Sequence, residues 1–317
     1  MLYYLLKRLF YTLPIALGVT LIVFMLVHLA PGDPLNAVVP ADAPAEVVER
    51  LRQAYGFDKP LPIQYLIWMG HVATGELGTS IATGRPVAGE IGPAILNTLL
   101  LALAAAFVGF SGGTLLGGIA GFTQGRAWDK LATGLAITGV SVPHYWLGIV
   151  LVIFFSVELN LLPAMGMGPG GSSAWAWDWL HVRHMVLPVV TLSVIPLGVV
   201  ARTVRSCVAE ILNQEFVQAL HAKGLLNRQV VGHVVKNAAP VVLAVIGLQL
   251  GYLLGGSILV ETVFSWPGAG FLMNDAIFRR DLPLLQGTIL VLALFFVLLN
   301  LFVDLIQTMF DPRIRRG

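Results

Sequence analysis

The sequence predicts an all-α polytopic membrane protein with six transmembrane helices. Its 317 residues are 57% hydrophobic and only 11% charged, and the mean hydropathy is +0.83, whereas an ordinary soluble domain carries about 25% charged residues. A membrane-spanning helix needs about 20 mainly apolar residues, and six blocks of this kind occur along the chain. They are Leu9–Ala30, Ala94–Phe122, Leu131–Val157, Met185–Val204, Ala238–Val260 and Leu285–Met309.

The first block resembles a signal peptide at its start, because Lys7 and Arg8 precede an apolar run. That run is longer than the usual apolar region of about 7–15 residues, and it ends at Pro31-Gly-Asp-Pro34 without a small-residue cleavage site. We therefore expect the block to stay in place as the first span.

The orientation follows from the distribution of basic residues over alternate loops. The N-terminal end and residues 123–130, 201–236 and 310–317 hold 12 of the 19 Lys and Arg residues. The other loops, 31–93, 158–184 and 261–284, hold the remaining 7 together with 12 acidic residues. Since cytoplasmic loops are enriched in Lys and Arg, both termini are predicted to be cytoplasmic. The net charge of +2 indicates no nucleic-acid partner.

Two external segments lie between spans. Pro31–Pro93 is too long for a simple turn, and the patterns of Pro44–Tyr55 and Pro62–Val72 each predict an amphipathic helix, so we expect a small helical cap. Asn160–His184 carries Trp175, Trp177 and Trp179. These tryptophans either face a ligand or, as we favour, anchor the chain at the membrane interface, where Trp is enriched.

A polar segment, residues 206–237, separates the fourth and fifth blocks. Five residues in it are spaced for one buried helical face: Ile211, Leu212, Phe216, Ala219 and Leu220. Gly224 ends this helix, and Asn227 is expected to cap a second helix that runs into Pro240. Two interpretations stay open on the residues alone. The helix Gln218–Lys223 inserts into a groove on a partner protein, or the segment lies on the membrane as an amphipathic hairpin.

The sequence offers little for catalysis. It contains no Gly-x-x-x-x-Gly-Lys-[Ser/Thr] motif, so we expect ATP to bind elsewhere than on this chain. No cofactor or metal site is predicted, because only His181 and His184 among seven histidines are close in sequence. The lone Cys207 excludes a disulfide framework. One alternative is an intramembrane serine protease similar to rhomboid, with Ser111 of Gly109-Phe-Ser-Gly112 as nucleophile and His144 as base.

The same stretch has a simpler interpretation as a packing surface. Gly109 and Gly112 belong to a set of small residues with the spacing of a helix–helix contact face. The set continues with Gly113, Gly117, Gly118 and Gly121.

The segment Glu261–Gly270 follows the fifth block and breaks its helix at Pro267 and Gly268. Phe264 and Trp266 are placed to pack into the external mouth of the bundle. Together with Gly270 these residues form a candidate gate or ledge. The alternative is an interfacial turn with an aromatic anchor.

Five stretches in order resemble the permease subunits of bacterial ABC importers of the dipeptide, oligopeptide and nickel type. Ala222-Lys-Gly224 with Asn237-Ala-Ala-Pro240 is similar to the ATPase-coupling loop of that family. The other four stretches are His28-Leu-Ala-Pro-Gly-Asp-Pro34, Gly75-Glu-Leu-Gly-Thr-Ser80 with Arg85-Pro-Val87, Glu261 to Gly270, and Asp311-Pro-Arg-Ile-Arg315. Gln218 stands where the family has an acidic residue, Leu220-His221 replaces the usual Ala-Arg, and the spacing from Gly224 to Pro240 is one or two residues short.

The resemblance implies a transporter subunit, not an enzyme, with the type I ABC importer permease fold in the bacterial inner membrane. Residues 1–93 would form the first span with its periplasmic segment, and residues 94–317 a five-helix core with the cytoplasmic coupling loop 206–237. The implied partners are a second homologous permease, two ABC ATPase subunits that hold ATP and magnesium, and a periplasmic solute-binding protein. The residues assigned to ATPase coupling are Glu215, Gln218, Ala219, Ala222, Lys223 and Gly224.

The resemblance leaves the solute open between a dipeptide, an oligopeptide, glutathione, a nickel chelate and an opine.

Overall fold

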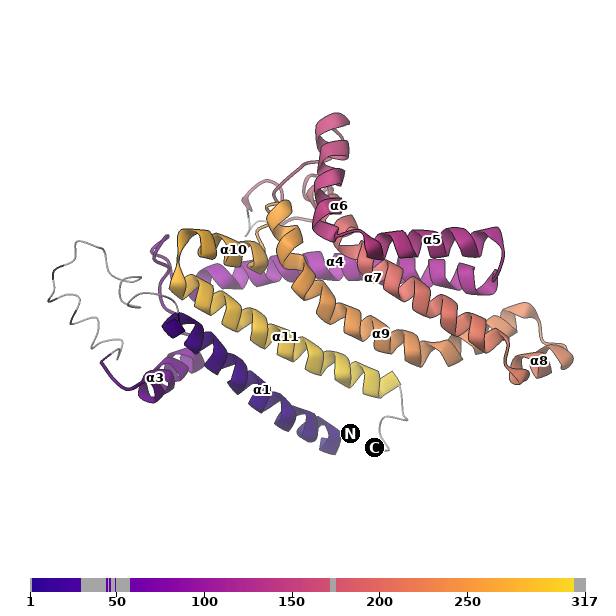
Figure 1. The fold of residues 1–317 in the computed structure, drawn as a ribbon, viewed down its shortest axis with the longest axis horizontal. Coiled ribbons are helices and arrows are strands. Elements are labelled where there is room, and N and C mark those ends of the chain that lie inside the picture. Colours follow the sequence, from indigo (N-terminus) through magenta and orange to yellow (C-terminus); the bar gives the residue numbers. More distant parts are fainter. Residues whose placement is uncertain are drawn as a thin grey trace. The chain divides into compact units, whose positions relative to one another are not determined.

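The computed structural model describes residues 2–29, 44, 46, 49, 58–171 and 175–310. Within these residues every regular element is helical, apart from an isolated bridge between Thr79 and Pro86 (Figure 1). The helices are α1 (Leu2–Leu29), α3 (Leu61–Thr74), α4 (Val87–Phe122), α5 (Ala127–Ser141), α6 (His144–Leu151) with a π-helical continuation η2 (Val152–Glu158), α7 (Trp179–Leu212), α8 (Glu215–Ala222), α9 (Asn227–Val263), α10 (Ala269–Arg279) and α11 (Leu282–Phe310).

Four described helices are long and apolar enough to cross a membrane, namely α4, α7, α9 and α11, and the bent pair of α5 with α6 and η2 makes a fifth if it counts as one span. The first predicted block, Leu9–Ala30, falls on α1 (Leu2–Leu29), and side chains of α1 are described only for residues 10–25, a stretch too short to be judged as a span. The all-α membrane fold is therefore confirmed, and the count of six spans stays a prediction.

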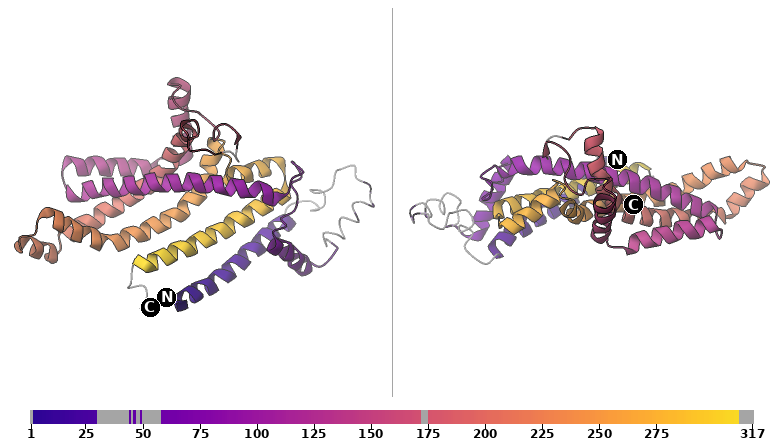
Figure 2. Two further views of the ribbon diagram at one scale, coloured as in Figure 1. Left: turned by 180° about the vertical axis from the view of Figure 1, so that it is seen from behind. Right: turned by 90° about the horizontal axis from the view of Figure 1, so that it is seen from above.

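The third predicted block is divided in two, which the sequence analysis did not anticipate. The axes of α5 and of α6 with η2 differ by 101°, and the bend is visible in both Figure 1 and Figure 2. Pro143 lacks a backbone N–H, and its ring disfavours the helical conformation for the residue before it. Val142 accordingly adopts an extended conformation with φ −87° and ψ 125°.

The chain divides into two compact units, each described by itself. The larger unit, Thr98–Trp266 with the end of α11, is built around α7, which contacts α5, α6 and α9. Glycines of α4 face α7 so closely that an added Cβ would lie 2.7 Å from the Leu197 carbonyl oxygen at Gly113 and 2.7 Å from the Val208 Cβ at Gly121. The predicted packing face of α4 is thus confirmed, except that Gly118 faces open space.

The smaller unit comprises residues 1–97 and Pro267–Leu301. Thr20 of α1 and Tyr65 of α3 share a hydrogen bond of 2.7 Å, and the rings of Phe24 and Tyr65 meet edge to face with centroids 5.4 Å apart. The helix predicted over Pro62–Val72 is therefore confirmed as α3. The predicted helix Pro44–Tyr55, the turn Pro31–Pro34 and the tail Asp311–Arg315 lie outside the described residues, apart from isolated positions of the first.

Asp281 fastens the loop before α4 to the start of α11 in this unit. The Ser80 hydroxyl donates to Asp281 Oδ2 at 2.5 Å, the Ala82 amide donates to the same oxygen at 3.1 Å, and the Leu284 amide donates to Oδ1 at 3.1 Å. The Asp281 side chain is fully buried. Burial by itself raises the pKa of Asp281, but these hydrogen bonds outweigh burial, so that its pKa lies below the usual value.

Replacing Gly113 by Ala is expected to lower the thermal unfolding midpoint of the purified protein. The new methyl group meets the Leu197 carbonyl at 2.7 Å and the Val200 Cβ at 2.9 Å, so α4 must move away from α7, at a cost of about 1–3 kcal/mol. Gly118→Ala is the matched control, because nothing lies within 4 Å of its Cβ position. Equal midpoints for the two variants would contradict close α4–α7 packing.

Acidification is expected to release the loop that Asp281 holds. Because folding lowers the pKa of Asp281, its carboxylate stabilises the fold above the unfolded pKa of about 3.9, and this contribution is lost as the pH falls through the lower folded value. Hydrogen exchange of the Ala82 and Leu284 amides, corrected for intrinsic rates, measures the release. Asp281→Asn should show weak protection that does not change between pH 3 and pH 6. If the protection of these amides in the wild type also stays constant between pH 3 and pH 6, the Asp281 carboxylate does not hold the loop.

Candidate functional site

The polar segment forms a helix, a glycine corner and a second helix, as the sequence predicts. The helix α8 runs from Glu215 to Ala222, and Gly224 adopts the left-handed conformation with φ 79°. The second helix, α9, continues without interruption from Asn227 into the fifth predicted span. Asn227 is not the cap, because it is already the first residue of α9; instead the Gln229 side chain accepts a hydrogen bond from the Leu226 amide at 3.0 Å.

All six residues assigned to coupling are exposed on this segment: Glu215, Gln218, Ala219, Ala222, Lys223 and Gly224. The exposure of Ala219 corrects the prediction that it belongs to the buried face. That face is formed instead by Val217, which is 2% exposed, with Phe216 and Leu220 packed beside it. The surface of α8 turned away from the protein is therefore polar or small.

A hydrophobic cluster seats α8 on its two neighbours. Val217 packs with Val208 and Ile211 of α7 and with Val230 and Val234 of α9, and all five are buried. Because close-packed interiors transmit strain, this cluster links α8 mechanically to the ends of α7 and α9.

The second predicted site, around Glu261–Gly270, is a helix break, as expected, between Val263 and Ala269. Phe264 and Trp266 are almost fully buried, so neither forms an open surface of this chain. The Gly166 amide donates to the Phe264 carbonyl at 2.8 Å, and the ring centroids of Trp175 and Trp266 lie 5.9 Å apart. The loop after η2 thus covers the two aromatic residues.

The remaining candidates of this segment begin α10 in the smaller unit. The Pro267 carbonyl accepts a hydrogen bond of 2.9 Å from the Asn97 side chain. Gly268 precedes the first residue of α10 in an extended conformation, and Gly270 is buried within the helix. Gly268 and Gly270 are buried and Pro267 is partly buried, and the role of these residues as a gate stays a prediction.

Besides Asp281, two further buried carboxylates were not singled out by the sequence analysis. Glu261 is fully buried in α9 and accepts a hydrogen bond of 2.8 Å from Thr98. Asp129 is buried at the start of α5 and binds Arg205. The available signal was an acidic residue next to an apolar block, where charge is costly unless it is paired. Glu261 entered the sequence analysis only among the loop charges and as the start of a matched segment, and Asp129 did not enter it at all.

The structure gives no support to a serine–histidine dyad. The Ser111 hydroxyl donates to the carbonyl of Phe107, one turn earlier in α4, at 2.5 Å. Among the described residues no hydrogen bond joins Ser111 to His144, which begins α6 after the break.

His181 and His184 each bind the loop between η2 and α7, and their ring nitrogens have separate partners. The Nδ1 atom of His181 lies 2.8 Å from Asp178 Oδ1, and its Nε2 atom lies 3.1 Å from the Pro169 carbonyl oxygen. His184 Nδ1 lies 3.0 Å from the Met165 carbonyl oxygen. Within residues 58–171 and 175–303, for which side chains are described, no three His, Cys, Asp or Glu residues are grouped for a metal ion. The hydrogen bond from His181 lowers the pKa of Asp178.

The tryptophans of the same loop differ in exposure. Trp177 and Trp179 are 76% and 68% exposed, whereas Trp175 is partly buried against His181 and Trp266.

Comparison with known proteins identifies the family. Residues 113–316 match the model of the binding-protein-dependent transport system inner membrane component, and residues 1–92 match the model of the N-terminal part of such membrane components. The dipeptide transport system permease protein DppB of Alkalihalophilus pseudofirmus is 36% identical over 332 residues, covering 99% of this chain and all of the relative. The glutathione transport system permease proteins GsiC of Salmonella typhimurium and Escherichia coli are 39% and 37% identical, each covering 99% of both chains.

A solved structure agrees in fold. The methionine ABC transporter MetNI, in inward-facing conformations, matches with a TM-score of 0.57 at 18% identity, over 70% of this chain and 96% of its own. The relatives are named as permease subunits, which leaves the intramembrane protease without support. The chain therefore belongs to the family of binding-protein-dependent transport system inner membrane components: it is a multi-pass inner-membrane permease subunit of an ABC importer and not an enzyme.

Proposed function

We propose that this chain, with a second homologous permease, lines the import path for peptides or similar small solutes. Two ATPase subunits, which hold ATP and magnesium, drive the cycle, and a periplasmic binding protein delivers the solute. The names of the relatives support the solute class, since dipeptides and glutathione are both short peptides with free carboxylates. The basic loops of the sequence support a cytoplasmic position for both termini and for α8.

The observation that carries the mechanism is the one-sided burial of α8. Its apolar residues, Phe216, Val217 and Leu220, face the cluster with α7 and α9, while Gln218, Ala219 and Ala222 are exposed. An amphipathic helix that lies on a membrane needs an exposed apolar face, and α8 has turned that face inward. Small exposed residues on a short helix instead suit the groove of a partner protein.

The hydrophobic cluster between α8, α7 and α9 then transmits movement of the ATPase subunits to the spans. When the ATPase subunits close on ATP, they displace α8, and the packed cluster carries the ends of α7 and α9 along. Rigid-body movement of these helices switches the path between its inward-facing and outward-facing states.

In the reconstituted transporter, solute-loaded binding protein stimulates ATP hydrolysis. We expect Gly224→Trp to reduce this stimulation by roughly tenfold or more. Gly224 has φ 79° and nothing lies within 4 Å of its Cβ position, so a large side chain projects from the exposed corner toward the partner without a clash inside this chain. Gly84→Trp is the matched control, since Gly84 also combines a positive φ of 68° with open space. Normal stimulation in Gly224→Trp would show that α8 does not dock on the ATPase.

The solute class is tested by uptake into proteoliposomes that contain the whole transporter and its binding protein. Dipeptides or glutathione should compete for uptake and stimulate ATP hydrolysis, whereas free amino acids should not. A transporter that responds to nickel chelates or opines and ignores peptides would refute the proposed solute, while the family and the role of α8 would stand.

A further inference from the structure

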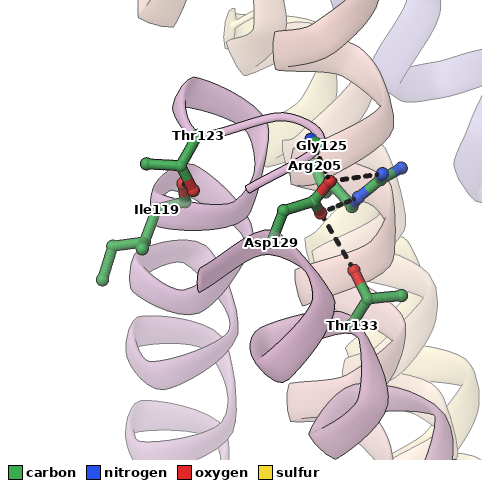
Figure 3. A network of polar contacts seen from close by, with 6 residues as sticks. All are labelled: Ile119, Thr123, Gly125, Asp129, Thr133 and Arg205. Carbon is green, nitrogen blue, oxygen red and sulfur yellow. Dashed lines mark hydrogen bonds and ion pairs between the residues drawn. The ribbon is translucent and has the colours of Figure 1, made fainter. Parts of the chain in front are cut away.

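An ion pair between Asp129, which is buried, and Arg205, which is partly exposed, joins α5 to α7. Arg205 of α7 binds Asp129 of α5 with two hydrogen bonds, Nε to Oδ1 at 2.5 Å and Nη2 to Oδ2 at 2.9 Å (Figure 3). The Gly125 amide donates to Oδ2 at 2.9 Å, and the Thr133 hydroxyl donates to Oδ1 at 3.2 Å. Asp129 is only 3% exposed. Its carboxylate is thus held from the turn after α4, from α5 itself and from α7.

Holding α5 against α7 does not by itself require this ion pair. Gly198 of α7 lies so close to α5 that an added Cβ would be 2.5 Å from the Ala136 carbonyl oxygen, and Gly139 meets Val194 in the same way. The ion pair adds little net stability, because Asp129 loses its hydration when it is buried, while Arg205 stays partly exposed. The two parallel hydrogen bonds instead restrict the arrangement of α5 and α7, because they fix both the distance and the angle between these helices.

The position of Arg205 on α7 relates the ion pair to α8. Arg205 lies between Val204 and Val208, and both of these valines belong to the buried cluster that seats Val217 of α8. The stretch Val204–Val208 of α7 therefore contributes both to the cluster that contacts α8 and to the ion pair with Asp129.

A movement of α5 would change its angle to α6 at the Ser141 end of α5. α5 runs from Ala127 to Ser141, and the extended Val142 separates it from α6. Because no helical hydrogen bonding continues through Pro143, α5 can change its angle to α6 at this point, while Asp129 near its other end follows α7.

We propose that Asp129 and Arg205 are positioning residues that make α5 follow the movement of α7 when the ATPase subunits displace α8. This inference rests on the proposed docking of α8. Without the ion pair, α8 and α7 still respond to the ATPase, and ATP is still hydrolysed in response to loaded binding protein, but α5 lags and fewer solutes are moved for each ATP.

The test measures solute transported per ATP hydrolysed by the whole transporter in proteoliposomes. Arg205→Lys keeps the positive charge but loses the planar two-donor group, and Asp129→Asn keeps the shape but loses the charge. Each should lower transport per ATP at least about fivefold, the lower end of typical coupling between sites, with stimulated ATP hydrolysis retained. Arg202→Lys, at an exposed position one turn earlier on α7, is the matched control and should behave as wild type.

The double variant distinguishes a shared contact from two separate defects. Asp129→Asn combined with Arg205→Lys should lower transport per ATP no further than the worse single variant, because both changes break one interaction. Multiplied effects would overturn the proposal. So would a wild-type ratio in complexes of either single variant, even if their thermal stability falls, since that result would leave the ion pair with a purely structural role.

Failure of this inference is distinguishable from failure of the proposed function. If α8 does not dock on the ATPase, Gly224→Trp retains stimulated ATP hydrolysis, whatever Arg205→Lys does. If α8 docks but the ion pair does not position α5, Gly224→Trp loses stimulation while Arg205→Lys transports normally.

Discussion

The close contact of α7 with its neighbours is the constraint on which the larger unit depends. In a lipid bilayer helices gain little from the hydrophobic effect when they associate, so they must pack through their backbones and small side chains. Gly113 and Gly121 of α4 and Gly198 of α7 allow this approach, because a side chain at any of them would overlap the neighbouring helix. The backbones of the three helices consequently lie close together at these positions.

The two ends of α7 belong to different hydrophobic clusters. Toward Leu212, valines and Ile211 form a seat for α8 that is apolar although it lies at the predicted cytoplasmic end. Toward the other end, Leu187 and Leu192 join the cluster around Phe264 and Trp266. A single helix of 34 residues therefore contacts both the proposed coupling segment and the loop that covers the aromatic pair.

Local features of the fold were predictable from the sequence, and contacts between distant residues were not. Hydropathy over about 20 residues locates spans, and a glycine after an amphipathic stretch indicates the corner at Gly224, because both signals are carried by neighbouring residues. The residues that bind Asp281 and Asp129 are not neighbours in sequence: Ser80 and Asp281 are 201 positions apart, and Asp129 and Arg205 are 76 apart. The burial of Trp266 likewise depends on a loop a hundred residues earlier. The bend at Pro143 was readable in principle, since the rule for residues before proline applies directly to Val142.

That bend also constrains the surroundings of the third span. The last turn of a helix leaves up to four carbonyl groups without donors from its own backbone, and Ser141 ends α5 within an otherwise apolar stretch. Acyl chains cannot donate hydrogen bonds to these carbonyls. In the assembled transporter the break between α5 and α6 must therefore be bathed by water or covered by protein, and lipid is excluded from it.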